Sequence, residues 1–276
     1  MRLLERWLSE LSPLQRTLDL GCGAGSLRVQ LAHMTVIGVD LDPKQFSRNR
    51  DLPGVCAESH CLPFASRSFD LVVCHHSLEH FRDLPGTVAE ISRVLKPGGR
   101  LFVSVPDGDS FSDHLYRFLL CGGGHLQRFS FHGVVSAVES GTGLHLTGWK
   151  ELYASFTFVN KQTFLPSPRG PLPGPLPRRM RWLGHLPRLC FDAARLSLNI
   201  ATRLMDRCFS TRLSQYGWAL AFGPEAISPQ TEAACWNVCM SCGAAIDEAP
   251  DESVGRLLYR CPYCSHLNVL FSNDRS

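Results

Sequence analysis

Short apolar runs alternate with stretches of helical periodicity in the first third of the chain. Four of these runs, TLDLG, TVIGVD, FDLVVCHH and RLFVSVP, are rich in Val, Ile and Leu and are bounded by Gly or Pro. Runs that are apolar throughout are typical of strands buried on both faces of a parallel sheet. We therefore expect strands over 17–21, 35–40, 69–76 and 100–106, and a weaker strand over 54–58.

Helical periodicity fills the segments 26–34 and 83–95, and the second segment ends at the stop signal Lys96-Pro97-Gly98-Gly99. Strands that alternate with helices predict an α/β, Rossmann-like fold with an open, mostly parallel sheet and right-handed crossovers. Two further strands are expected over 144–160 and 215–222.

A basic, proline-rich block separates these last two strands. Residues 161–210 hold nine Lys or Arg against two Asp, and seven of the eighteen prolines. The prolines of 171–188 exclude a regular helix or strand and favour a loop or polyproline II segment. Residues 189–209 predict an amphipathic helix, whose polar stripe consists of Asp192, Arg195, Asn199, Arg203 and Asp206.

The pattern predicts four parts: a core over 1–160, the insertion over 161–210, a final strand and linker over 211–230, and a cysteine-rich module over 235–272. The composition, with 44% hydrophobic and 19% charged residues, is globular. No apolar run approaches eighteen residues, and the start lacks the apolar core of a secretory signal. We therefore expect a cytoplasmic protein, in which twelve cysteines favour metal binding over disulfides.

Three glycines follow the first predicted strand directly, in the sequence LDLGCGAGSL. Glycine lets a backbone turn sharply and approach a ligand closely. The spacing G-x-G-x-G is one residue tighter than the dinucleotide fingerprint, so a pyrophosphate fits less well. Asp40 ends the next strand, where a carboxylate can accept both hydroxyls of a ribose. Without Asp40 the glycines would fit a plain strand–helix connection equally well.

Four motifs, in this order, resemble class I S-adenosylmethionine (SAM)-dependent methyltransferases. They are the strand and glycine loop over 17–25, VIGVDLDP, ESHCLPFASRSFDLVVCHHSLEHF and RVLKPGGRLFVSVPD. The chain is most similar to the ubiquinone/menaquinone-biosynthesis C-methyltransferases, over about ninety residues. The resemblance implies a seven-stranded sheet whose last strand is antiparallel, with SAM bound over the carboxyl ends of the strands.

The same resemblance implies the cofactor-binding residues. The loop around the methionine part of SAM matches Asp19, Gly21, Cys22 and Gly23. Asp40 matches the acid that binds the ribose, and Leu41 an apolar residue beside the adenine ring. Glu58 stands where the family usually has an aspartate near the adenine amino group, and Ser59 follows where alanine is common.

A methyltransferase of this kind mainly aligns the nucleophile, the methyl group and the sulfur, because the sulfonium already makes the methyl group electrophilic. A base is needed only if the acceptor must lose a proton. His75 and His76 end a predicted strand and point to opposite sides if the strand continues, so at most one of them faces SAM. We favour His76. The polar segment that follows, residues 107–130, is expected to form a substrate lid.

Two C-x-x-C turns, Cys239 with Cys242 and Cys261 with Cys264, enclose eighteen residues. Four thiolates at this spacing suit a closed, structural Zn²⁺ site and resemble a zinc ribbon, with short strands over 257–260 and 267–271. A redox pair would need a thioredoxin-like setting, which the flanking sequence lacks.

The leading hypothesis is methyl transfer to a small-molecule or lipid- or sugar-linked acceptor. Basic and aromatic residues before the amphipathic helix favour contact of 178–209 with a membrane surface, whereas packing on the sheet or on a dimer partner is the alternative. A second hypothesis is an RNA or protein methyltransferase that uses the zinc ribbon to grip its substrate. Residues 235–276 hold five acids against three Arg, so nucleic acid is not expected. A third is a catalytically silent SAM-binding scaffold. The acceptor atom and the oligomeric state stay open.

Overall fold

The computed structural model of the chain describes residues 15–23, 35–46, 53–120, 124–160, 178–231, 239, 258–262 and 264–269. The chain divides into two compact units. The first comprises Met1–Gly108, Leu126–Lys150 and Trp218–Glu232, and the second comprises Asp109–His125, Glu151–Gly217 and Ala233–Ser276.

One large sheet carries the fold, in the strand order β3-β2-β1-β4-β5-β7-β6-β8. Its strands are β1 (Arg16–Leu20), β2 (Thr35–Asp40), β3 (Gly54–Cys56), β4 (Phe69–His75), β5 (Leu95–Pro106), β6 (His145–Tyr153), β7 (Gln215–Gly223) and β8 (Gln230–Thr231). The strands from β3 to β5 pair in parallel. This arrangement confirms the predicted α/β, Rossmann-like sheet, and its strands begin or end within a few residues of the expected positions.

The prediction of seven strands was wrong, because the described sheet has eight. The additional strand β8 is only two residues long, and it pairs in parallel with β6 at Gly148 and Trp149. Gln230 and Thr231 are both exposed. A polar pair at a sheet edge has no apolar run that a sequence pattern could detect. Strand β8 was not predicted, and the strand expected to be last and antiparallel, over 215–222, is β7.

Strand β7 is antiparallel to β6, as expected of the last predicted strand. Thr147 Oγ1 donates to the carbonyl of Ala221, and farther along β6 the amide of Ala154 donates to the carbonyl of Ser214. The contacts advance along β6 while they move backwards along β7, so these two strands are antiparallel.

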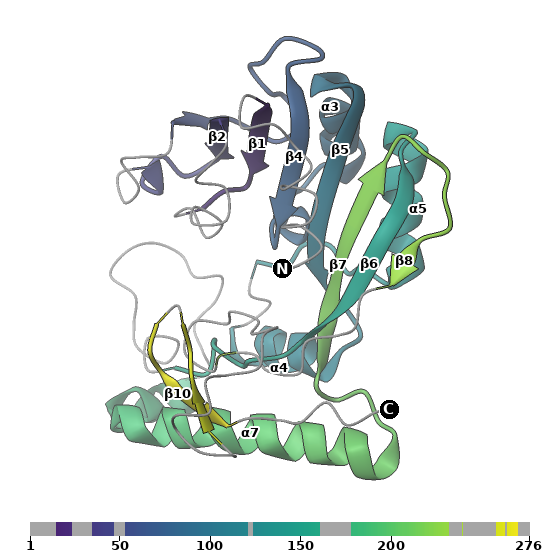
Figure 1. Cartoon of the computed structure of the whole chain (residues 1–276). Helices are drawn as coiled ribbons and strands as arrows, with labels where there is room; N and C mark the ends of the chain where they lie inside the picture. Colours follow the sequence, from purple (N-terminus) through teal and green to yellow (C-terminus); the bar gives the residue numbers. More distant parts are fainter. Residues whose placement is uncertain are drawn as a thin grey trace. The chain divides into compact units, whose positions relative to one another are not determined.

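Two helices cover one face of the sheet (Figure 1). Helix α3 (Leu84–Val94) begins at Asp83, whose carboxylate accepts from the amide of Gly86, and α5 (Phe131–Thr142) begins in the same way at Ser130. The two helices contact each other, and they pack buried side chains against the strands. This core consists of residues such as Leu18, Leu20, Val72, Ile91, Val103, Val134, Val138 and Leu220.

The described part of the second unit contains three helical segments, α4 (Phe111–Leu119), η3 (Arg178–His185) and α7 (Arg188–Phe209). A separate apolar cluster holds them together and consists of Leu119, Ala154, Phe156, Val159 and Phe191. Helix α7 occupies the predicted segment 189–209, whereas α4 lies in a segment expected to be a lid. Among the described residues, no helix combines the length and the apolar character needed to cross a bilayer.

Two short antiparallel strands, β9 (Leu258–Arg260) and β10 (Leu267–Val269), lie where the cysteine-rich module predicts them. Arg260 pairs with Leu267, so the intervening Cys261 and Cys264 occupy the turn between the two strands.

Candidate functional site

The loop after β1 has a conformation that requires glycine. Gly21 has φ 75° and Gly23 has φ 51°, both in the left-handed region. The amides of Gly21 and Cys22 donate to the carbonyl of Val39, at 2.8 and 3.0 Å. A Cβ on Gly21 would lie 2.4 Å from Cβ of Ser77. The loop is therefore held closely between the ends of β2 and β4, and Gly25 lies outside the described residues.

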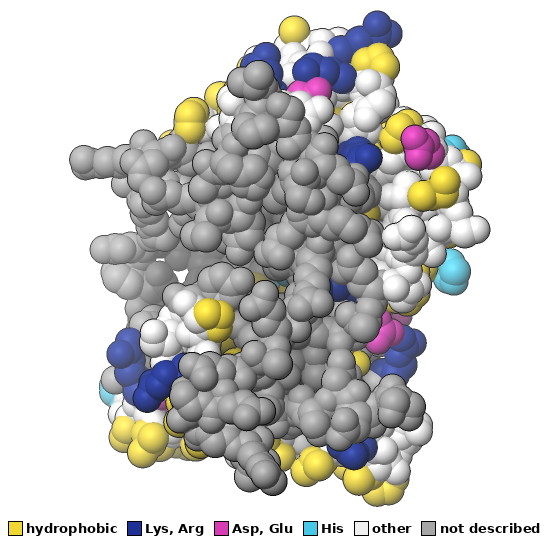
Figure 2. Space-filling view, in the orientation of Figure 1, with side chains coloured by type: hydrophobic (Ala, Val, Ile, Leu, Met, Phe, Trp, Pro, Cys, Tyr) yellow, Lys and Arg dark blue, Asp and Glu magenta, His cyan; other side chains and the backbone are white. Residues whose placement is uncertain are grey.

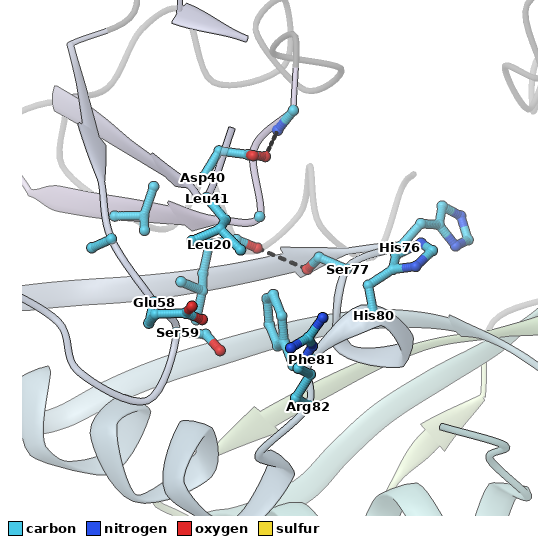
Figure 3. A pocket seen from close by; sticks show the side chains of 14 residues that line it. Leu20, Asp40, Leu41, Glu58, Ser59, His76, Ser77, His80, Phe81 and Arg82 are labelled. Atoms are coloured by element: carbon cyan, nitrogen blue, oxygen red, sulfur yellow. Dashed lines mark hydrogen bonds between the residues drawn. The ribbon is translucent and has the colours of Figure 1, made fainter. Parts of the chain in front are cut away.

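Asp40 connects this loop to the end of β2. Its Oδ2 accepts a hydrogen bond of 2.8 Å from the amide of Gly23, and its Oδ1 accepts one of 2.9 Å from the amide of Asp42 (Figure 3). A carboxylate has about four acceptor sites, so about two remain for a ligand. The carboxylate is thus fixed in place while it keeps the capacity to accept two hydroxyl groups.

A cavity of about 380 Å³ opens beside this loop in the first unit. The carboxyl ends of β1, β2 and β4 contribute to its wall, which is where parallel α/β sheets bind ligands. Six of the eight predicted cofactor-binding residues line it, namely Gly21, Gly23, Asp40, Leu41, Glu58 and Ser59. Asp19 and Cys22 are not part of its lining.

Asp19 and Cys22 are buried beneath the loop. Burial, with a further contribution from the charge of Asp40, raises the pKa of the Asp19 carboxyl to about 7. Burial and the same two carboxylates raise the pKa of the Cys22 thiol to about 12. Cys22 is therefore a neutral thiol at physiological pH and is not suited to act as a nucleophile.

The remaining predicted cofactor-binding residues differ in their exposure to the cavity. Leu41 is 61% exposed and presents an apolar side chain to it, and the carboxylate of Glu58 is also exposed. Ser59 is buried, and its hydroxyl lies 2.7 Å from the hydroxyl of Thr87 on α3. The Ser59 hydroxyl therefore already has a protein partner.

The two neighbouring histidines relate differently to the cavity, although their ring centroids lie only 4.4 Å apart. His76 lines the cavity and has φ 50°, which turns the chain at the end of β4. Its Nδ1 lies 4.0 Å from Oε1 of the buried Glu79. His75 does not line the cavity, and its Nδ1 lies 2.6 Å from Oγ of Ser104. Burial lowers the pKa of His75 to about 4, so its imidazole is neutral near pH 7.

Several residues of the cavity wall were not among the predicted site residues. Ser77 donates to the carbonyl of Leu20 at 2.7 Å, and Phe81 and Arg82 follow in the same segment (Figure 3). All three come directly after β4. The rule that ligands bind at the carboxyl ends of parallel strands could have identified this segment, although not the side chains that point inward.

Three of the four cysteines proposed as metal ligands lie together in the second unit. The sulfur atoms of Cys239, Cys261 and Cys264 are within 4.8 Å of one another, and Sγ of Cys239 lies 3.6 Å from Sγ of Cys264. None of the three forms a disulfide. Around a zinc ion with Zn–S bonds of about 2.3 Å, tetrahedral sulfur ligands lie about 3.8 Å apart. Cys242 lies outside the described residues.

The backbone around this cluster forms a tight turn. The amide of Cys261 donates to the carbonyl of His266 at 2.9 Å, and the amide of Ser265 donates to the carbonyl of Cys261 at 2.8 Å. Asn268 Nδ2 lies 3.6 Å from Sγ of Cys239, an amide-to-sulfur contact. The thiols are therefore held in position by the backbone of the turn and by a buried amide.

Comparison with known proteins finds sequences that are similar to part of the first unit. Residues 18–103 match the family model of a methyltransferase domain. Over 108 residues the chain is 34% identical to the biotin biosynthesis bifunctional protein BioHC of Saccharophagus degradans, covering 36% of this chain and 19% of that protein. Over 99 residues it is 32% identical to the demethylmenaquinone methyltransferase of Corynebacterium urealyticum, covering 34% and 43%. The chain thus spans less than half the length of these curated relatives.

The fold is shared more widely than the sequence. The YcgJ protein of Bacillus subtilis has a similar structure with a TM-score of 0.52 and 20% identity, over 80% of this chain and 96% of that chain. An identity this low shows a common fold only. Residues 18–103 are thus similar to a methyltransferase domain, and the structural likeness shows a common fold.

Proposed function

We propose that the protein transfers a methyl group from SAM to a small-molecule or lipid- or sugar-linked acceptor. The observation that carries this proposal is the position of Asp40, which is fixed by the amides of Gly23 and Asp42 and faces the cavity with acceptor capacity left. A carboxylate at the end of the second strand, next to a glycine turn, suits the two hydroxyls of a ribose.

The residues of the cavity fit an adenosyl group in other respects. Gly21 and Gly23 bring the backbone close to the cavity, Leu41 offers an apolar surface to a base, and the Glu58 carboxylate can accept from an amino group. When bound, SAM supplies an electrophilic methyl group. The protein's own contribution is then to position the acceptor and to exclude water.

A proton must be removed only for some acceptors, and His76 is the candidate base. It lines the cavity, and its Nδ1 lies 4.0 Å from Oε1 of the buried Glu79. His75 is a poor candidate because its Nδ1 contacts Ser104 and burial lowers its pKa to about 4.

We further propose that Cys239, Cys242, Cys261 and Cys264 bind a structural Zn²⁺ ion. The convergence of three thiols supports this, with a sulfur–sulfur distance close to the edge of a tetrahedral site. Four thiolate ligands would leave no open position for a substrate, so the ion would stabilise the module without a role in methyl transfer.

The proposed activity is tested in two stages with purified, metal-replete protein. Calorimetry first measures the binding of SAM and of its demethylated product. Tritium transfer from methyl-labelled SAM into a fractionated lysate then identifies the class of acceptor. Asp40→Ala is the test variant, and Asp42→Ala is its control because Asp42 does not line the cavity.

Each outcome has one meaning. Label in lipid or in small metabolites, lost in Asp40→Ala and kept in Asp42→Ala, supports the proposal. Label in RNA or protein would overturn the acceptor class in favour of a macromolecular substrate. Binding of SAM without any transfer would favour the silent scaffold, and the lack of binding heat for both compounds would overturn the cofactor assignment.

A further inference from the structure

Helix α7 buries its polar stripe and exposes a face of small and apolar residues. The predicted polar stripe includes Arg195, Asn199, Arg203 and Asp206, and all four are buried. In most globular proteins the apolar stripe of a surface helix faces the core. In this orientation the opposite face of the helix is exposed.

Hydrogen bonds hold several of the buried polar groups, which stabilises this orientation. Arg203 donates to Oδ1 of Asn199 at 2.6 Å and lies over the ring of Tyr153. Asp206 accepts from the amides of Leu213 and Ser214, at 2.7 and 2.8 Å. These contacts fix the turn that follows the helix, and they determine which face of α7 points outward.

The exposed face of α7 is continuous and uncharged. It consists of Cys190, Ala193, Ala194, Ser197, Ala201, Leu204, Met205 and Cys208, which recur at the spacings of one helical face. Leu204 is 53% exposed and Met205 41%. The largest apolar side chains mark the two ends of the helix, with Leu189 at 75% and Phe209 at 68% exposure, and Trp182 precedes it in η3 at 61%. We call this set the α7 face.

The charges around the α7 face are positive. Arg188 and Arg207 are exposed at the two ends of the helix. Of the two acids in α7, Asp206 is buried, and Asp192 pairs with Arg195. The sequence adds Arg178, Arg179 and Arg181 in η3, so residues 178–209 hold seven Arg against two Asp. Figure 2 shows hydrophobic side chains along the lower margin of the molecule, where α7 lies in Figure 1, with Lys and Arg among them.

We propose that the α7 face docks on a membrane surface of anionic lipids, with the helix axis parallel to the bilayer. A helix of 22 residues is about 33 Å long, so a contact of this kind would immerse the apolar side chains of its exposed face while its buried side stays on the protein. Exposed Arg residues at both ends would lie at the level of the lipid phosphates.

The charges favour a lipid surface over a second copy of this chain. A two-fold axis through the α7 face would bring the exposed Arg residues of one copy near those of the other, and the partly exposed acid of the helix, Asp192, already pairs with Arg195. An anionic bilayer offers phosphates to the same residues. The proposal concerns a surface separate from the SAM cavity and does not depend on the proposed activity.

The test is co-sedimentation of the full chain with vesicles of phosphatidylcholine alone, or mixed with phosphatidylglycerol, at low and high salt. We expect binding to the anionic vesicles that weakens as salt rises. The double substitution Leu204→Glu/Met205→Glu, and separately Leu189→Glu, should weaken it at least about tenfold, because charged groups would have to enter the apolar layer. Ile227→Glu is the matched control, since Ile227 is 47% exposed and lies in the first unit.

A second pair of variants tests the charges. Arg188→Glu/Arg207→Glu should abolish the preference for anionic vesicles, whereas Arg67→Glu, at an exposed residue of the first unit, should leave it unchanged. Light scattering measures the oligomeric state of every variant. The proposal is overturned if the wild-type protein binds neither vesicle, if the α7 variants bind as the wild type does, or if they convert a dimer into a monomer without an effect on vesicle binding.

Discussion

The amide of Gly23 donates a hydrogen bond of 2.8 Å to Oδ2 of Asp40, so the glycine loop and the end of β2 are joined through one carboxylate. The other oxygen accepts from the amide of Asp42. A ligand that binds here meets a carboxylate that is already oriented. Preorganisation of this kind reduces the ordering cost of binding.

Replacing Asp40 should therefore weaken SAM binding. Asp40→Asn keeps the size of the side chain but loses its charge and one acceptor, and we expect about a 10- to 100-fold loss in affinity for one lost charge-assisted hydrogen bond. Calorimetry with SAM measures it. Asp42→Asn should bind within about twofold of the wild type, and an unchanged affinity in Asp40→Asn would contradict the assigned role.

Gly21→Ala should destabilise the fold more than Gly143→Ala does. Both glycines have a left-handed φ, 75° and 72°, so both substitutions introduce about 1–2 kcal/mol of backbone strain. A Cβ at Gly143 meets nothing within 4 Å, whereas at Gly21 it would lie 2.4 Å from Cβ of Ser77. Overpacking adds about 1–3 kcal/mol at Gly21. Urea denaturation of both variants measures the difference, and equal losses would show that the contact with Ser77 relaxes freely.

Asp19 should make the stability depend on pH. Its folded-state pKa is raised to about 7, mainly by burial and further by Asp40, above an unfolded value near 4. The folded state thus binds the proton more tightly. The resulting stability is fully present below about pH 4 and is lost as the pH rises through 7.

Asp19→Asn removes this titration and should flatten the curve of unfolding free energy against pH between about 4 and 7. The wild-type slope from this one group reaches at most about 1.4 kcal/mol per pH unit. Urea denaturation across this range measures it, with Asp42→Asn as the control that keeps the wild-type slope. A parallel slope in Asp19→Asn would mean that Asp19 titrates at its ordinary pKa.

The apolar strands of the sheet could be predicted from sequence because burial on both faces selects runs of Val, Ile and Leu. The position of Asp40 could be predicted from the same pattern, because the apolar run stops at Asp40 and so marks the end of the strand. Neither the φ of His76 nor the contact of Ser59 with Thr87 had a local signal, because both depend on residues about 28 positions away, at Ser104 and Thr87. A turn with a positive φ is hard to predict from sequence in a segment without glycine, such as 76–82.

Helix α7 shows a different limit. The sequence showed the polar stripe of this helix, but it did not show whether the stripe faces solvent or the protein interior. A polar stripe usually faces water. Here Asp206 caps the amides of Leu213 and Ser214, and Arg203 bonds to Asn199, so the stripe faces inward. Only the tertiary contacts decide between the two directions.

The cysteine module should lose zinc when one ligand is removed. Cys264→Ser should lower the zinc content from one ion per chain, because a hydroxyl is a poor substitute for a thiolate. Cys190→Ser is the matched control, since Cys190 is an exposed free thiol on α7. Metal analysis after dialysis against a mild chelator measures both. Equal zinc contents, or no zinc in the wild-type protein, would rule out the proposed site.

His76→Ala should lower the rate of methyl transfer without changing the affinity for SAM. The side chain lines the cavity, but Asp40 and the glycine loop hold the proposed adenosyl site independently of it. General-base catalysis contributes about 10²- to 10⁴-fold, so labelled transfer into the acceptor fraction should fall by at least about 100-fold. His132→Ala, at an exposed residue of α5, should keep the wild-type rate.

The two readouts separate the roles that His76 can have. A slower transfer at unchanged SAM affinity supports proton removal or acceptor positioning, and a steeper dependence on pH in the wild type than in His76→Ala assigns the effect to proton removal. If SAM affinity falls in parallel with the rate, His76 acts on the cofactor cavity. If neither the transfer rate nor the SAM affinity changes, the acceptor reacts without a base at this position. The end of β4 then contributes only to the shape of the cavity.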